Sequence, residues 1–155
     1  MADKPNITKD SEVTLREVNA DTVRTICNLD VTETQKQFVA PNAVSIAQAH
    51  FSDKAWFRAI YADEEPVGFA MLYEDHEKPE YYLWRFMIDQ RYQKFGFGWK
   101  AMDLLIDRVR SHPKATCFET SVVEADGGPG PFYERLGFKY TGGYEDDEAV
   151  MRLEF

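Results

Sequence analysis

The chain has 155 residues, of which 44% are hydrophobic, 14% aromatic and 29% charged, a composition that excludes a disordered or collagen-like chain. The 27 acidic residues outnumber the 18 basic ones, and the net charge of −9 argues against nucleic-acid or anionic-membrane partners. No apolar run approaches the roughly 20 residues of a membrane span, and Met1 is not followed by the apolar stretch of a secretory signal, so we expect a cytoplasmic protein. Cys27 and Cys117 have no CxxC neighbour, which favours buried free thiols over a disulfide.

The predicted elements begin after a polar stretch. Residues 1–10 are expected to be a flexible lead-in to a single domain over residues 11–155. Alternating hydrophobic residues predict strands, and hydrophobic residues three and four apart predict helices. In chain order these are a strand at 11–18, a helix starting at 19–21, a helix at 41–51, strands at 55–61, 67–73 and 81–88, a helix from 98 that ends at 112, a strand at 116–123, a helix at 131–136 and a hairpin at 138–155 with an acidic turn at 145–148.

The order of these elements is β-α-α-β-β-β-α-β-α-β-β. It predicts an α/β protein with a mixed sheet and helices on its faces. The polar residues 74–80 are expected to form the turn between two of the strands.

A glycine-rich loop joins the strand at 81–88 to the helix that follows it. Gly96 and Gly98 lie where that helix begins, and Lys94 and Lys100 flank them. A helix start offers unpaired N–H groups and a positive dipole end, and glycines let the backbone approach a ligand, so the loop has the properties of an anion site. Taken alone, the two glycines are also explained by a tight turn.

Two motifs together carry a resemblance to a known family. Residues 93–98 (Gln-Lys-Phe-Gly-Phe-Gly) match the Q/R-x-x-G-x-G/A signature of the GNAT superfamily of N-acetyltransferases, and residues 132–138 (Phe-Tyr-Glu-Arg-Leu-Gly-Phe) resemble its second signature. The stretches 38–42 and 82–88 look, more narrowly, like bacterial spermidine/spermine acetyltransferases. The resemblance covers essentially the whole chain and implies a GNAT-like fold.

The resemblance implies acetyl-CoA as cosubstrate, and the sequence shows no metal-ligand spacing, so no metal is expected. Backbone groups of Phe86, Met87 and Ile88 are expected to pair with the pantetheine arm. Tyr133 is expected near the CoA sulfur, where its phenol would protonate the departing thiolate, although a buried packing role is the alternative. The amides that are expected to hold the pyrophosphate belong to Gln93, Lys94, Phe95, Gly96, Phe97, Gly98 and Trp99.

Two positions depart from the family pattern. Asp126 stands where many relatives carry an asparagine seven residues before the tyrosine, and a carboxylate is unfavourable near CoA phosphates. We therefore expect the following Gly127-Gly128-Pro129 loop to bind through backbone amides. Phe95 replaces a small or basic residue, which is expected to alter contacts to the adenosine moiety.

The general base is less clearly marked. An alkylamine is protonated at neutral pH and must lose a proton to attack, so a carboxylate is needed. Glu33, Glu119 and Glu124 are the candidates, with Glu119 on the strand beside the cofactor, and a solvated surface charge is the alternative for each. His50, His76 and His112 fall in helix ends or loops, and neither a metal-ligand spacing nor a Ser-His-Asp set is present.

The acceptor side is expected to be acidic. Asp30, Glu33 and the turn at 145–148 would hold a polycation, which predicts a small cationic amine such as spermidine or spermine as acceptor. The alternatives are an aminoglycoside, an amino-acid derivative, a protein N-terminus, or a module that binds CoA without turnover. A homodimer is compatible with the sequence.

Overall fold

The computed structural model describes residues 6–155, so the first half of the predicted lead-in, residues 1–5, lies outside the described residues. The strands are β1 (Val13–Arg16), β2 (Ala55–Ala62), β3 (Glu65–Asp75), β4 (Glu80–Ile88), β5 (Cys117–Val122), β6 (Lys139–Glu145) and β7 (Glu148–Glu154). The α-helices are α1 (Val23–Cys27), α2 (Asn42–His50), α3 (Phe97–Arg110) and α4 (Gly130–Arg135), and the 3-10 helices are η1 (Gln35–Gln37) and η2 (Gln90–Tyr92).

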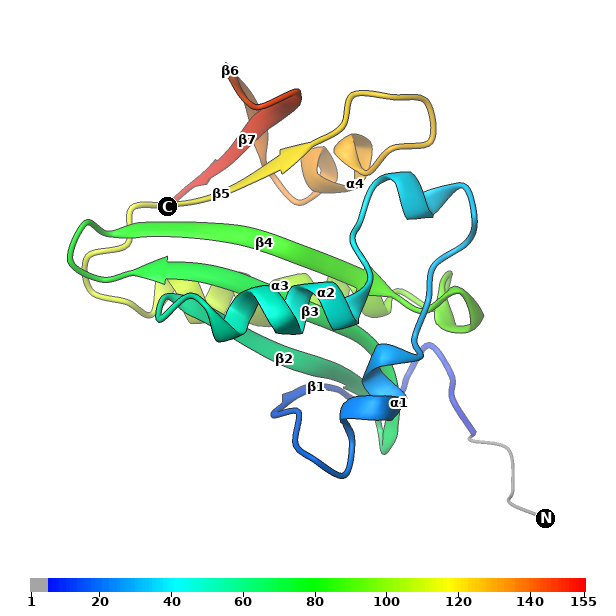
Figure 1. Ribbon diagram of the computed structural model, residues 1–155. Coiled ribbons are helices and arrows are strands. Elements are labelled where there is room, and N and C mark those ends of the chain that lie inside the picture. The colour runs from blue at the N-terminus through cyan, green and yellow to red at the C-terminus, as the bar shows by residue number, and fades with distance from the viewer. Residues whose placement is uncertain (1–5) are drawn as a thin grey trace.

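The strands form one mixed sheet in the order β1-β2-β3-β4-β5-β7-β6 (Figure 1). The pair β4–β5 is parallel and is connected by α3, whereas the other neighbouring pairs are antiparallel. The predicted fold class and order of helices and strands are confirmed, with η1 and η2 as short additions.

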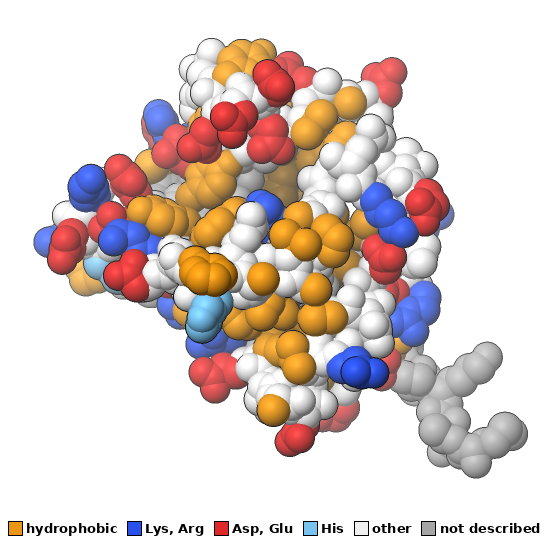
Figure 2. Space-filling model, viewed as in Figure 1, with side chains coloured by type: hydrophobic (Ala, Val, Ile, Leu, Met, Phe, Trp, Pro, Cys, Tyr) orange, Lys and Arg blue, Asp and Glu red, His pale blue; other side chains and the backbone are white. Residues whose placement is uncertain are grey.

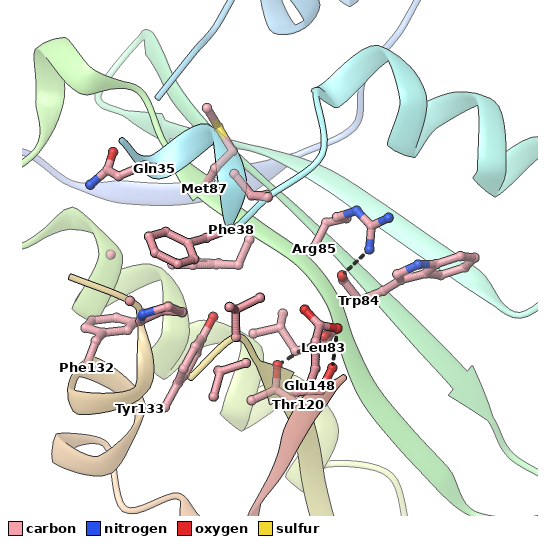
Figure 3. Close-up of a pocket in the computed structure, with 18 of the residues that line it drawn as sticks. Gln35, Phe38, Leu83, Trp84, Arg85, Met87, Thr120, Phe132, Tyr133 and Glu148 are labelled. Carbon is pink, nitrogen blue, oxygen red and sulfur yellow. Dashed lines mark hydrogen bonds between the residues drawn. The ribbon is translucent and has the colours of Figure 1, made fainter. Parts of the chain in front are cut away.

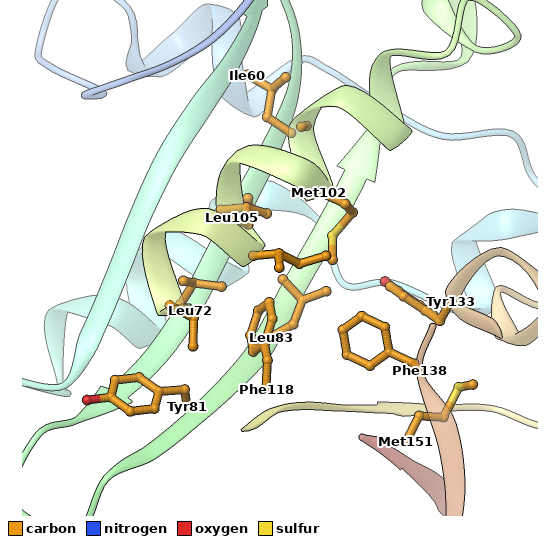
Figure 4. Packing of buried hydrophobic residues seen from close by; sticks show 14 of the residues in the cluster. Ile60, Leu72, Tyr81, Leu83, Met102, Leu105, Phe118, Tyr133, Phe138 and Met151 are labelled. Carbon is orange, nitrogen blue, oxygen red and sulfur yellow. The ribbon is translucent and has the colours of Figure 1, made fainter. Parts of the chain in front are cut away.

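Helices cover both faces of the first half of the sheet. On one face the apolar stripe of α3 packs against alternate residues of β3 and β4, and Figure 4 shows Met102 and Leu105 pointing toward Leu72 and Leu83. On the other face α1 and α2 pack against the residues in between, such as Phe69 of β3. The strand at 65–75 is therefore buried on both faces, whereas the strand at 80–88 is fully buried only at Tyr81, Leu83 and Met87.

The end of β3 differs from the predicted turn at 74–80. Glu74 and Asp75 continue the strand and are buried, because other groups satisfy their charges. Arg108 of α3 donates two hydrogen bonds to the Glu74 carboxylate at 2.8 and 3.0 Å, and His112 lies 3.1 Å from it. The run of polar residues predicts a turn here, because the sequence alone does not show that Arg108 of α3 pairs with Glu74.

Two expectations from composition concern the cysteines and membranes. Cys27 and Cys117 are free thiols as expected, but both are half-buried rather than fully buried. Within residues 6–155, no helix combines the length and the apolar character that crossing a bilayer requires.

Candidate active site

The sheet divides between β4 and β5. The two strands pair at Tyr82↔Glu119 and Leu83↔Thr120, and no further pair joins them within the described chain. A β-bulge lies at this point, since Leu72 faces Leu83 while the preceding residue of β3 faces Arg85, which leaves Trp84 as the extra residue of β4. Beyond the bulge the strands separate, as Figure 1 shows, so β4 has an open edge along 84–88.

Alternate residues of this edge turn their backbone groups into the opening. Asp89 donates its amide to Val67 of β3, so Met87, two residues earlier, also faces β3, while Phe86 and Ile88 face the opening. The side-chain amide of Gln93 donates to the Ile88 carbonyl at 2.9 Å, which ties the loop to the end of the strand. The backbone groups of Phe86 therefore form the exposed strand edge of this segment.

A cavity of about 1740 Å³ fills the opening between the strands. It is larger than the roughly 300–1,000 Å³ of a typical ligand pocket, which is enough for two substrates. Figure 2 shows the hollow in this face, with acidic side chains gathered on the part of the molecule formed by β5, β6 and β7. Of the eleven residues that the sequence predicts to contact the cofactor, all except Phe95 line the cavity.

The loop before α3 has the geometry of an anion site. Lys94 and Gly96 have positive φ angles of 72° and 83°, so consecutive amides turn toward one side. Among residues 6–155, no acceptor receives a hydrogen bond from the amides of residues 94–99. The 14-residue helix α3 adds its positive dipole end at the same point. The loop can therefore hold a phosphate group through its backbone.

Tyr133 of α4 is buried at 6% exposure and lines the cavity. Its ring packs edge-on against Phe132 and Phe138, and Figure 3 shows its hydroxyl pointing into the cavity. Burial, followed by the nearby Tyr82, raises the pKa of the Tyr133 phenol above its ordinary range. The phenol thus stays protonated at neutral pH, as a general acid must.

The predicted carboxylates are engaged in ion pairs. Glu119 lines the cavity and accepts two hydrogen bonds from Arg152, at 3.1 and 3.2 Å. Asp30 and Glu33 lie 3.3 and 2.7 Å from Lys36, and neither lines the cavity. The structure therefore brings Glu119 together with the predicted cofactor residues, and it leaves Asp30 and Glu33 outside that group.

The two departures from the family pattern also lie outside the cavity wall. The Phe95 ring stacks on Phe97 with the ring centres 5.3 Å apart, and Phe95 is absent from the cavity lining. Asp126 is exposed and does not line the cavity, whereas Gly127 and Gly128 do, as does Pro129. Glu124, the third candidate base, is also absent from the lining.

Several lining residues were not predicted from the sequence. Gln35 of η1 bonds to the Gln93 amide at 2.8 Å and brings the α1–α2 connection over the opening. Tyr82 and Ser121, which were not predicted, form a hydrogen-bonded row across three strands with Glu148, a residue of the acidic turn that was predicted to hold a polycation. These three residues are far apart in the chain, so only the alternation of side chains along each strand could have indicated from the sequence that they share a face.

The divided sheet, the glycine-containing helix start and the buried tyrosine together define an acetyltransferase of the kind that the two motifs predict. Residues 23–138 match the Acetyltransferase (GNAT) family, and the chain belongs to this family. The Spermine/spermidine N(1)-acetyltransferase of Bacillus subtilis (strain 168) is 28% identical over 149 residues, which cover 92% of this chain and 98% of that protein. The chain is therefore an N-acetyltransferase.

Solved structures show the same fold. The spermidine N-acetyltransferase of Vibrio cholerae, in complex with CoA and spermine, superposes with a TM-score of 0.71 at 15% identity, over 90% of this chain and 92% of that one. The ribosomal-protein-S18-alanine N-acetyltransferase of Escherichia coli superposes with a TM-score of 0.68 at 18% identity, over 92% and 94%. These two neighbours act on different amines, so the shared fold does not select an acceptor.

Proposed function

We propose that the protein transfers the acetyl group of acetyl-CoA to a small cationic amine, specifically a polyamine such as spermidine or spermine. The observation that carries this proposal is the opening between β4 and β5, which ends at the free amides before α3. A thioester held in this opening would be reachable from both faces of the sheet.

The donor side fits CoA in two ways. The amides of residues 94–99 would hold the pyrophosphate, and the open edge of β4 at Phe86 would pair with the amide groups of pantetheine as an added strand. Ile88 contributes less to this pairing, because its carbonyl already accepts a hydrogen bond from Gln93. Met87 would contribute through its side chain, which lines the cavity.

Tyr133 would act on the sulfur. The acceptor nitrogen attacks the thioester carbonyl carbon, and the C–S bond breaks when the tetrahedral intermediate collapses. The Tyr133 phenol gives its proton to the departing thiolate and regains one from the acetylated nitrogen. Its placement in the cavity favours an enzyme over a module that only binds CoA.

The acceptor side is acidic and aromatic. Glu145, Asp146 and Glu148 line the cavity from the β6–β7 hairpin, and Tyr82 and Trp84 line it from β4. Carboxylates and aromatic faces both attract ammonium groups, and several such groups along one chain can be held at once. The names of the B. subtilis relative and the V. cholerae neighbour support a polyamine.

An acetyl-transfer assay that measures free thiol tests this function. The acceptors are spermidine, spermine, a monoamine, an aminoglycoside, an amino-acid amide and a short peptide, each at low and high salt. We expect the lowest KM for the polyamines, with an advantage that shrinks as salt screens the charges. Preference for another acceptor would reject the polyamine, and CoA binding without thiol release from any acceptor would reject the enzyme.

A further inference from the structure

Three hydroxyl and carboxylate side chains form a row on the acceptor face of the cavity. The Tyr82 hydroxyl bonds to the Ser121 hydroxyl, which donates to a Glu148 oxygen at 3.1 Å. The serine has one proton, and it is directed to the carboxylate, so the tyrosine must be the donor to the serine. Each hydrogen bond in the row thus points toward Glu148, and Figure 3 shows this carboxylate among the residues that line the cavity.

The row lies next to the place where acetyl transfer would occur. Tyr82 pairs with Glu119, one position before Leu83↔Thr120, the last pair at which β4 and β5 are joined. Tyr82 and Tyr133 both line the cavity. An acceptor nitrogen directed at a thioester near Tyr133 would therefore come close to the Tyr82 oxygen.

We propose that the row of Tyr82, Ser121 and Glu148 removes the proton of the acceptor ammonium group and that Glu148 is the base that receives it. This inference rests on the proposed acetyl transfer and assigns the base of that reaction.

The proton moves in balanced steps. The ammonium group gives a proton to the Tyr82 oxygen while the Tyr82 proton passes to Ser121 and the Ser121 proton passes to the Glu148 carboxylate. The neutral amine then uses its lone pair to form the C–N bond. Glu148 releases its proton to solvent after transfer, and Tyr133 handles the second proton, so one proton leaves in total.

The charges around the row favour Glu148 as the receiver. Glu119, the base predicted from the sequence, is already engaged by Arg152, which donates two hydrogen bonds to it. Arg85 of β4 lies near Glu148, but its hydrogen bonds go to the Trp84 carbonyl and to Gln48 of α2.

Neighbouring groups allow the row to transfer rather than hold a proton. Glu145 and Asp146 line the same cavity, so the side of it that holds Glu148 is acidic. Burial, together with the Glu145 and Glu148 carboxylates, raises the pKa of Tyr82 to about 12. Tyr82 therefore stays neutral and passes on the proton that it receives.

The test compares Glu148→Gln, Ser121→Ala and Tyr82→Phe with the wild type by the pH dependence of kcat/KM. Glu154→Gln is the control, because it removes a carboxylate from the exposed end of the same strand, β7. We expect each row variant to lose about 10²-fold in kcat near pH 7 and to recover toward pH 10, where the free amine is abundant. The loss should also shrink for an acceptor amine whose pKa lies below 7.

Thermal unfolding and CoA affinity verify that each variant is folded. The proposal is overturned if Glu148→Gln, or both Ser121→Ala and Tyr82→Phe, keep the wild-type pH profile, or if their loss is a pH-independent rise in KM. The function itself fails separately, when the wild type releases no thiol with any amine.

Discussion

Gly96 is the position where the structure gives the most specific expectation for cofactor binding. It caps the start of α3 with a φ of 83°, in the left-handed region, and a Cβ built at this residue meets no atom within 4 Å. A side chain at position 96 therefore meets no steric obstacle in the protein without bound CoA. The cost of a substitution comes from the backbone conformation, which L side chains rarely adopt.

The size of this cost follows from the conformation. Holding alanine in the left-handed region costs about 1–2 kcal/mol, so Gly96→Ala should lower Tm by about 2–8 °C in a chain of this length. If the loop relaxes to escape the strain, CoA must restore its shape on binding, and affinity should fall by about 5–30-fold. Asparagine tolerates this conformation better, so Gly96→Asn should lose less.

Gly142 provides a matched control. It has a φ of 86° in β6, its Cβ would also meet nothing within 4 Å, and it does not line the cavity. Gly142→Ala should therefore lower Tm as Gly96→Ala does and leave CoA affinity unchanged. Calorimetric titration with CoA and thermal unfolding measure both quantities. Equal CoA affinity in a Gly96→Ala protein whose Tm is also near that of the wild type, which means that the loop has relaxed, would show that the loop before α3 does not hold the cofactor.

Three further predictions concern catalysis, stability and the acceptor. Tyr133→Phe should lower kcat by about 10²–10⁴-fold with CoA affinity near wild type, and a kcat within twofold would leave Tyr133 as a packing residue. Glu74→Gln should destabilise the fold by about 1–3 kcal/mol, less than for a fully buried pair because Arg108 is one-third exposed. Burial disfavours the charged form of Glu74, but the hydrogen bonds and charge of Arg108 prevail and hold the pKa of Glu74 below its ordinary value. The destabilisation by Glu74→Gln, measured by unfolding in denaturant, should therefore disappear as pH falls below about 4. Glu33→Lys should raise KM for spermine more than for a monoamine. The rise should be only a few-fold at low salt, because the Glu33 side chain is 89% exposed and solvent screens its charge. Equal changes in KM for the two acceptors would show that Glu33 does not take part in acceptor binding.

Much of the fold could be predicted because it depends on local patterns. The stripe at Met102, Leu105 and Val109 predicts α3, and the burial of these residues explains why the pattern is there. The end of β3 could not be predicted in this way. Glu74 is a polar residue in a strand only because Arg108, 34 positions later, supplies its partner. The bulge at Trp84 depends likewise on pairing with β3, which no local pattern reveals.

The donor side of the site is equally local. Residues 86–99 form one continuous strand, loop and helix start, so their chemistry depends on short-range backbone geometry that glycines reveal. Tyr133 could be found from its motif, but its burial and the direction of its hydroxyl needed the packing of α4 beside the opening. The side-chain direction of Phe95 depended in the same way on its neighbour Phe97.

The proposed acceptor side is assembled from distant segments, and this explains why Tyr82 and Ser121 escape a sequence reading although the acidic turn at 145–148 was predicted. The hydroxyls of Tyr82 and Ser121 meet across 39 positions, and Ser121 meets Glu148 across 27. Each belongs to a different strand, and the three meet only because β5 lies between β4 and β7 in the sheet. Because these side chains do not shape the loop that we propose holds CoA, they can change without disturbing it. One fold can thus serve different amines, as the two solved neighbours with different named acceptors illustrate.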